Sequence, residues 1–189
     1  KIVPDKINTY TIGFQIAPRI NAPGRIDHAT KSFELLVTDD REEAKSLAEW
    51  LNQKNDERQI EMKKIIESSV NQVEENHLLT DPVIVVSGQW ARGVIGPSAS
   101  RLVDKFNRPV IVMTREEDEY TGSARSIEGV HLIEMLDQLS PYLKKYGGHS
   151  GAAGLTIDKE NYAGFLEHLK LWASAHIKSE SLVKKIMVD

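Results

Sequence analysis

Three polar side chains suited to phosphate oxygens lie close together near the start of the chain. Arg19, Asn21 and Arg25 fall within seven residues, with Pro18 directly before them and Pro23 among them, and this segment predicts a rigid turn. A guanidinium group matches a phosphate with two parallel hydrogen bonds. The segment therefore predicts a phosphate-binding site. The alternative is that the arginines pair with Asp27 or Asp39 at a contact between two parts of the chain.

A glycine-containing turn between a predicted strand and a predicted helix is the second candidate. Gly88 and Gly93 flank Trp90 and Arg92 there. Backbone N–H groups at a helix start carry the positive end of the helix dipole, so together with Arg92 they favour an anion. The alternative is that the glycines and the tryptophan serve packing alone.

A Ser/Arg pair on a predicted strand is the third candidate. Ser123 and Arg125 alternate with small residues, and side chains two apart on a strand point to the same face. The pair predicts a phosphate clasp on a surface that a substrate backbone approaches closely. A solvated Ser/Arg strand is the alternative.

The fourth candidate has almost no side-chain bulk. Gly147, Gly148 and His149 open a segment in which Gly151 and Gly154 follow. Such a loop makes sense if another backbone lies against it. His149 then donates to a phosphate oxygen or a base edge, with a bond to a local carbonyl as the alternative.

Composition argues against a complete catalyst. The chain has no cysteine, which suits a reducing cytoplasm, and no run of apolar residues long enough to span a membrane. Its Asp, Glu and His residues have neither metal-ligand spacing nor a Ser/His/Asp arrangement. The net charge of −4 requires any nucleic-acid site to be local. We expect a binding lobe.

A long helix is predicted to follow an irregular N-terminal segment. Residues 1–38 contain three prolines and two glycines between short apolar runs, so loops with one or two helical turns are expected. Asp39 and Asp40 are capping signals for a helix that runs to about Asn76. One face of this helix is apolar but is interrupted at Asn55 and Arg58.

The second half of the chain predicts a small α/β domain. A strand, a helix and a second strand at 83–113 form a βαβ unit with a parallel pair of strands. The acidic run after it predicts a turn. The remaining expected elements are a strand at 120–126, a helix at 130–139, a strand at 152–157 and a helix at 161–177.

Taken in order, these segments resemble the RecJ family of single-strand-specific DNA exonucleases, in the DHH/DHHA1 phosphoesterase superfamily. The similar stretches are PRINAPGRID, WARGVIGPSASRLVDKFNRPVIVM, GSARSI and YGGHSGAAGLTI, and the resemblance covers about residues 10–175. Residues 182–189 read as the opening of a strand, so an excised C-terminal fragment is expected.

The resemblance implies a division of labour within the family. A preceding DHH domain, absent here, holds two Mn²⁺ or Mg²⁺ ions for 5′-to-3′ phosphodiester hydrolysis in DNA repair and recombination. Arg25, with Arg19 second, Ser123 and Arg125 are expected to bind the 5′ phosphate and nearby backbone. The strand channel is then lined by Gly147, Gly148 and His149.

The same resemblance implies partners and domain boundaries. The partners are single-stranded DNA and, among proteins, a single-strand-binding protein or a RecQ-type helicase. The boundaries place a connector at 1–38, the connecting helix at 39–78, a mixed-sheet DHHA1 domain at 79–178 and the start of another domain at 179–189.

One departure and two alternatives remain open. Family members commonly have His after the motif tryptophan, where this chain has Ala91, so binding is weaker or Arg92 substitutes. The alternatives are a DHH/DHHA1 phosphodiesterase acting on short RNA or cyclic dinucleotides, and a non-catalytic binding module.

Overall fold

The computed structural model describes residues 4–184 and divides the chain into two compact units. The division falls between Glu61 and Met62, inside one long helix, so each unit contains part of that helix. The first unit is helical, and the second contains a mixed β-sheet. The predicted α/β class with a long helix before the sheet is confirmed.

Short helical pieces, where loops were predicted, make up the start of the first unit. They comprise a 3-10 turn at Pro4–Lys6, a π-helical stretch at Thr11–Ile16, and α1 (Ala17–Asn21), α2 (Pro23–Ile26) and α3 (Thr30–Val37). The loop prediction for residues 1–38 was therefore wrong. Pro18 and Pro23 lie in the first turns of α1 and α2, where a helix needs no N–H from the residue. These prolines were interpreted as signals for loops and turns, but in the structure they lie at the starts of helices.

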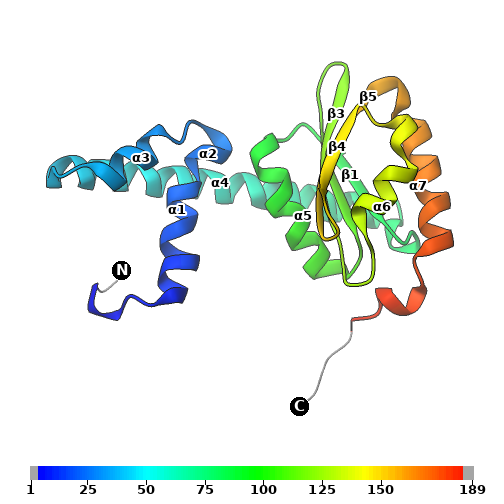
Figure 1. Ribbon diagram of the computed structural model, residues 1–189, viewed down its shortest axis with the longest axis horizontal. Coiled ribbons are helices and arrows are strands. Elements are labelled where there is room, and N and C mark those ends of the chain that lie inside the picture. The colour runs from blue at the N-terminus through cyan, green and yellow to red at the C-terminus, as the bar shows by residue number, and fades with distance from the viewer. Residues whose placement is uncertain (1–3, 185–189) are drawn as a thin grey trace, which may run out of the picture. The chain divides into compact units, whose positions relative to one another are not determined.

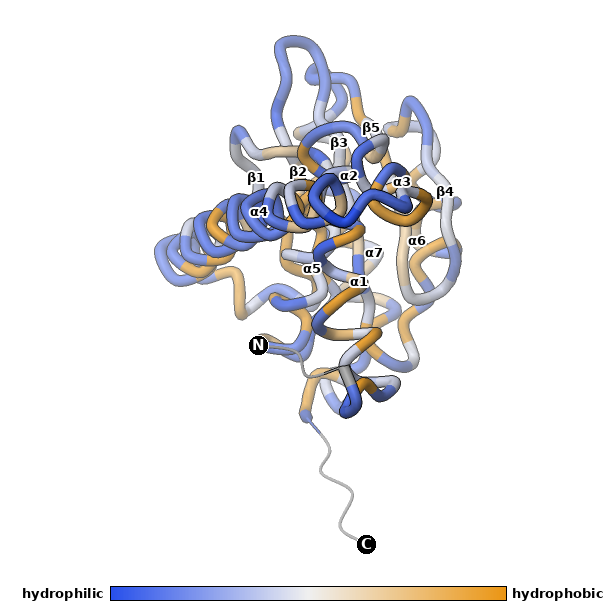
Figure 2. The backbone as a smooth tube through the Cα atoms, turned by 90° about the vertical axis from the view of Figure 1, so that its left-hand side faces the viewer, coloured by the Kyte–Doolittle hydropathy of each residue, from blue (hydrophilic) through white to orange (hydrophobic). Residues whose placement is uncertain are grey.

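Helix α4 spans Arg41–Glu75 and confirms the predicted long helix. Asp40 caps its start, because the Asp40 Oδ1 atom accepts hydrogen bonds from the backbone N–H groups of Glu42 at 2.8 Å and Glu43 at 3.1 Å. These two glutamates also face the positive end of the helix dipole. Most of the helix is hydrophilic in the tube of Figure 2.

A five-stranded sheet in the order β1-β2-β3-β5-β4 organises the second unit. The strands β1 (Ile84–Gly88) and β2 (Val110–Arg115) are parallel and are joined by α5 (Arg92–Phe106), which confirms the predicted βαβ unit. The other strands pair antiparallel (Figure 1). Their bounds are Glu119–Arg125 for β3, Lys145–His149 for β4 and Ala152–Asp158 for β5.

The two faces of this sheet have different coverings. Helices α6 (Leu132–Gln138) and α7 (Tyr162–His176) pack on one face and enclose the main core, while α5 packs on the other face against β2 and β3 (Figure 1). On β3 the buried residues are Tyr120, Gly122 and Ala124, so the residues between them belong to the α5 face. The remaining 3-10 turns are Leu78–Thr80, Ser140–Tyr142, Lys159–Asn161 and Ser179–Leu182.

Strand β4 was not predicted. The segment around Gly147 and His149 was expected to be a loop, but it forms an edge strand in which all five residues are exposed. Glycine-rich sequence carries little strand signal, and pairing with β5 decides the conformation. The predicted strand opening at 182–189 does not appear at Leu182, which ends a 3-10 turn, and residues 185–189 lie outside the described residues.

None of the helices in the described part of the chain is both long and apolar enough to cross a membrane.

Candidate nucleic-acid interface

Strand register gathers two of the sequence candidates on one face of the sheet. Ser123 pairs with Gly154, which pairs in turn with Gly147; in the next row Arg125, Ala152 and His149 follow one another in the same way. Side chains in such rows point to one face. This is the face that α5 covers over β2 and β3, while all residues of β4 are exposed. We call the following residues the open face: Thr121, Ser123 and Arg125 of β3, Ala152, Gly154 and Thr156 of β5, and Lys145, Gly147 and His149 of β4.

The Ser/Arg pair is preorganised. The Arg125 Nη1 atom donates hydrogen bonds to the Ser123 Oγ atom at 3.0 Å and to the Ala124 carbonyl oxygen at 2.7 Å. Both side chains are half-buried. The prediction that they share a face is confirmed, and a held guanidinium loses less conformational entropy when it binds an anion.

Helix α5 closes over this pair at a glycine. A Cβ atom at Gly96 would lie 3.1 Å from the Arg125 Nη2 atom and 3.2 Å from the Ser123 Oγ atom. The absence of a side chain at Gly96 therefore leaves room for the ends of the Arg125 and Ser123 side chains beneath the helix. The sequence patterns did not identify Gly96 as a candidate site residue. The only sequence signal for its role is a glycine in the first turns of a predicted helix.

His149 presents one ring nitrogen to the surroundings. Its Nδ1 atom accepts a hydrogen bond from the Gly151 backbone N–H at 3.2 Å, so in the neutral ring the proton resides on Nε2. The side chain is exposed at the end of β4. The geometry thus leaves Nε2–H as a donor on the same row as Arg125.

The glycines of this hairpin have two different roles. A Cβ atom at Gly147 would meet nothing within 4 Å, and one at Gly154 would meet only the Gly122 carbonyl oxygen at 3.9 Å. At Gly148, with φ of +150°, a Cβ atom would lie 2.2 Å from the Ala152 carbonyl oxygen. We expected another backbone to lie against this glycine-rich segment. At Gly148 that backbone is β5, the neighbouring strand of the same hairpin. Gly147 leaves the open face flat.

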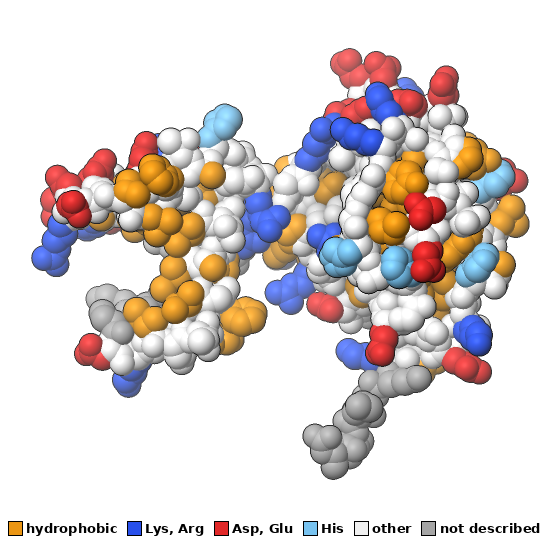
Figure 3. Space-filling view, viewed as in Figure 1, with side chains coloured by type: hydrophobic (Ala, Val, Ile, Leu, Met, Phe, Trp, Pro, Cys, Tyr) orange, Lys and Arg blue, Asp and Glu red, His pale blue; other side chains and the backbone are white. Residues whose placement is uncertain are grey.

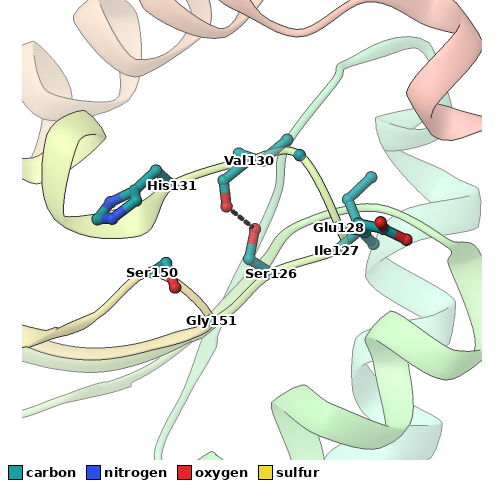
Figure 4. Close-up of a pocket in the computed structure, with 8 residues that line it drawn as sticks. Ser126, Ile127, Glu128, Val130, His131, Ser150 and Gly151 are labelled. Atoms are coloured by element: carbon teal, nitrogen blue, oxygen red, sulfur yellow. Dashed lines mark hydrogen bonds between the residues drawn. The ribbon is translucent and has the colours of Figure 1, made fainter.

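A hollow of about 530 Å³ lies beside the tip of this hairpin (Figure 4). Its rim joins the turn of Ser150 and Gly151 to the loop from Ser126 to His131. Two backbone hydrogen bonds fix this arrangement: Ser126 N–H donates to the Gly151 carbonyl at 3.1 Å, and Leu132 N–H donates to the Ser150 carbonyl at 3.0 Å. The hairpin tip is therefore held in place next to Arg125.

Trp90 has a packing contact of its own. A Cβ atom at Gly88 would lie 2.4 Å from the Trp90 ring, so the ring folds back over Gly88. The Trp90 backbone is held by Thr114, whose Oγ1 atom accepts from the Trp90 N–H at 3.1 Å and donates to the Trp90 carbonyl at 2.7 Å. These contacts favour the packing alternative for this turn.

Arg92 belongs to a charge network at the turn of the β2–β3 hairpin. Its guanidinium donates to both carboxylate oxygens of Glu116, at 2.5 and 2.6 Å, and to Glu119 at 3.0 Å. These hydrogen bonds raise the pKa of Arg92. Lys144 pairs with Glu119 at 3.1 Å and Asp158 at 3.2 Å. Acidic and basic side chains lie together at this end of the second unit in Figure 3.

In the first unit, the predicted phosphate-binding residues lie on α1 and α2. The Arg19 Nε atom donates to the Asn52 Oδ1 atom of α4 at 2.6 Å, and its Nη1 atom donates to the Gln15 carbonyl. Asn21 and Arg25 are exposed. Asp27, an alternative partner for the arginines, has an ion pair with Lys54 at 3.6 Å.

A second arginine of the first unit lies close to Arg25. Burial, and then repulsion by Arg25, lower the pKa of Arg58. The Arg58 Nη2 atom donates to the buried Asn55 at 3.0 Å, but its Nε atom is buried without a hydrogen-bond partner. Two neighbouring guanidinium groups with an unpaired buried donor favour an anion. The polar interruption of the apolar face of α4 was the sequence signal for these residues.

Within residues 4–184, no three His, Asp or Glu side chains are grouped so that they could hold a metal ion.

Comparison with protein families assigns the sheet-containing part of the chain. The model of the DHHA1 domain matches residues 80–175, which is more than half of the chain. The chain belongs to the DHHA1 family. The matched range contains every strand of the sheet and all three rows of the open face.

The DHHA1 chain is also similar to curated proteins over nearly its whole length. It is 38% identical to the single-stranded-DNA-specific exonuclease RecJ of Bacillus subtilis over 96% of this chain and 23% of that protein. It is 34% identical to the RecJ exonuclease of Haemophilus influenzae over 98% of this chain and 34% of that protein. The expected resemblance to the RecJ family is confirmed, and the chain spans about a quarter to a third of these relatives.

Solved structures share the fold of the DHHA1 chain. The structure of RecJ in complex with Mg²⁺ from Thermus thermophilus matches with a TM-score of 0.75 and 30% identity, over 87% of this chain and 26% of that one. A structure of exonuclease RecJ bound to manganese matches with a TM-score of 0.78 and 30% identity, over 88% of this chain and 42% of that one. Those RecJ proteins bind divalent metal ions.

Proposed function

We propose that this chain is the strand-gripping part of a longer single-strand-specific DNA exonuclease. The observation that carries the proposal is the pairing of Ser123 with Arg125 beside His149 on a flat, glycine-floored sheet face. The similarity to RecJ exonucleases over nearly the whole chain supports it.

The open face has the chemistry needed to hold a terminal 5′ phosphate. The Arg125 guanidinium and the Ser123 hydroxyl donate to the phosphate oxygens, and the His149 Nε2–H donates from the neighbouring strand. Gly147 and Gly154 let the sugar–phosphate backbone lie directly on the sheet. A site of this kind needs only a few donors, which reconciles DNA binding with a net charge of −4.

The first unit supplies a second set of phosphate donors in this proposal. Arg25 is the main one, and Arg58 adds the buried Nε donor that lacks a partner. Arg19 and Asn21 support them from α1. We assign Trp90 and Arg92 a supporting role, because their contacts hold the turn before α5 and the turn of the β2–β3 hairpin.

Hydrolysis itself is assigned to another part of the parent enzyme. Among the described residues, no three His, Asp or Glu side chains are grouped as a metal site. In our proposal a DHH domain holds the Mn²⁺ or Mg²⁺ ions, and this chain orients the strand against that centre. A single-strand-binding protein or a RecQ-type helicase as protein partner, and work in the cytoplasm in DNA repair and recombination, are further parts of the proposal.

Competition binding tests the substrate class. A labelled single-stranded oligonucleotide bound to the chain is displaced with unlabelled single-stranded DNA, duplex DNA, short RNA or a cyclic dinucleotide. We expect single-stranded DNA to compete best and duplex DNA poorly. Preferential displacement by short RNA or the cyclic dinucleotide would instead support the phosphodiesterase alternative. Equal displacement by all four would indicate a binding module without this specificity.

A further inference from the structure

Lys145 occupies the end of the open face that lies away from His149. Its register partner on β5 is Thr156, and the partner of Thr156 on β3 is Thr121, so these three residues form one row across the face. Lys145 is exposed, and its ammonium group forms no ion pair or hydrogen bond with any described residue. Lys145 is thus a second cation of the open face beside Arg125, and its ammonium group is not bonded to Ser123 or Arg125.

A hollow of about 350 Å³ lies beside this row. Polar and apolar residues of three strands line it: Thr121, Gly122, Lys145, Tyr146, Gly147, Gly154, Leu155 and Thr156. Because neither Gly147 nor Gly154 presents a Cβ atom, the hollow continues directly into the row that holds Ser123. One extended chain could therefore lie across both rows.

The hydroxyl of Thr121 adds an independent sign of a ligand. Its Oγ1 atom is buried, and it has no hydrogen-bond partner among the described residues. Buried polar groups normally have partners, and an orphaned one points to an absent ion, water or ligand. Thr121 lines the same hollow as Lys145, and a threonine hydroxyl is able to donate to a phosphate oxygen.

The acidic groups nearest in the sequence to Lys145 have other cation partners. Lys144 is paired with Glu119 and Asp158, and Arg92 is paired with Glu116 and Glu119. No described carboxylate is paired with Lys145, so its ammonium group is available to attract an anion.

We propose that Lys145 and Thr121 bind a second backbone phosphate of the strand whose 5′ phosphate is held by Ser123 and Arg125. This inference rests on the proposed function. Lys145 and His149 are the two ends of β4, and at the usual rise per residue they are about 13 Å apart. In this proposal the two ends of β4 contact different phosphates of the bound DNA.

The test compares oligonucleotides that reach Lys145 with one that does not. The dissociation constants of the wild type, Lys145→Gln, Arg125→Gln and the control Lys178→Gln are measured for 5′-phosphorylated thymidine mononucleotide and hexanucleotide at several salt concentrations. Lys178 is exposed and lies beyond α7, outside the open face. Amide chemical shifts of Thr121 and Lys145 are followed in the same titrations.

We expect Lys145→Gln to weaken hexanucleotide binding by up to about fivefold, the range of an exposed ion pair. It should also lower the slope of log K against log salt by about 0.7, the value for one phosphate on a single strand. Mononucleotide binding should stay unchanged in this variant, whereas Arg125→Gln should weaken both ligands. The hexanucleotide alone should shift the amides of Thr121 and Lys145.

Two results would overturn the inference, and they are distinguishable. If Lys145→Gln binds the hexanucleotide as Lys178→Gln does while Arg125→Gln weakens both ligands, the second phosphate contact is wrong and the proposed function stands. If no oligonucleotide binds, or Arg125→Gln has no effect, the proposed function and the inference fail together.

Discussion

Gly96 of α5 lies directly over Arg125 of β3, at a distance where a Cβ atom would be 3.1 Å from the Arg125 Nη2 atom. The helix reaches the strand at this point because the glycine leaves room for the guanidinium. The relationship couples the packing of α5 to the position of the proposed phosphate-binding group. A substitution at Gly96 can therefore be used to distinguish an effect on stability from an effect on phosphate binding.

Gly96→Ala is therefore expected to weaken binding of a 5′ phosphate without loss of stability. The new methyl displaces the flexible end of Arg125 rather than backbone, and alanine is favoured over glycine in a helix by about 1 kcal/mol. We expect an unchanged or higher melting temperature and a several-fold weaker affinity for a 5′-phosphorylated oligonucleotide. Unchanged affinity would mean that the position of Arg125 is not important for binding.

The two adjacent glycines of β4 should respond differently to alanine. Gly148→Ala places a Cβ atom 2.2 Å from the Ala152 carbonyl oxygen at a φ of +150°, so the hairpin must distort. We expect a loss of about 2–4 kcal/mol in the free energy of unfolding, measured by denaturant titration. Gly147→Ala is the matched control, because its Cβ atom meets nothing. Equal losses in the two variants would contradict this account of the hairpin.

Ser69→Ala is expected to stabilise the protein. Ser69 lies in α4 with no exposed surface, and its hydroxyl has no hydrogen-bond partner among the described residues. Removing the oxygen relieves a desolvated polar group, and alanine has the higher helix propensity. The expected gain is about 1 kcal/mol, measured by denaturant titration. A loss of stability would show that the hydroxyl does have a partner.

The charge network at the β2–β3 hairpin predicts a pH dependence. Hydrogen bonding to Lys144, and then to Arg92, lowers the pKa of Glu119 below 4.5. A carboxyl group with a lowered folded-state pKa stabilises the fold above its unfolded-state value and loses that effect as pH falls through the folded-state value. The melting-temperature difference between the wild type and Glu119→Gln should be greatest near neutral pH, begin to shrink near the ordinary pKa of about 4.5, and disappear once the pH is below the lowered folded-state pKa. A constant difference would exclude this origin.

Local chemistry made several elements predictable from the sequence. Asp40 predicted the start of α4, and its side chain accepts the capping hydrogen bonds. The alternation at Ser123 and Arg125 placed both on one face, and their hydrogen bond confirms it. In each case the deciding interaction lies within a few residues along the chain.

Contacts between distant residues account for what the sequence did not predict. Pro18 and Pro23 look the same in the sequence whether they interrupt a loop or begin a helix, and here they begin helices. Strand β4 exists because β5 pairs with it. The closeness of Gly96 to Arg125, and of Arg58 to Arg25, depends on tertiary packing that no local pattern specifies. The domain boundaries at 38, 78 and 178 stay a prediction.

The most direct test of the central claim compares one oligonucleotide with and without its 5′ phosphate. Affinities are measured for the wild type, Arg125→Gln and Arg101→Gln, the last being an exposed arginine on α5 outside the open face. The account predicts that the phosphate tightens binding by the wild type and Arg101→Gln, and that Arg125→Gln loses this preference. Equal affinity of the wild type for the two ends, or a preference that survives in Arg125→Gln, would contradict it.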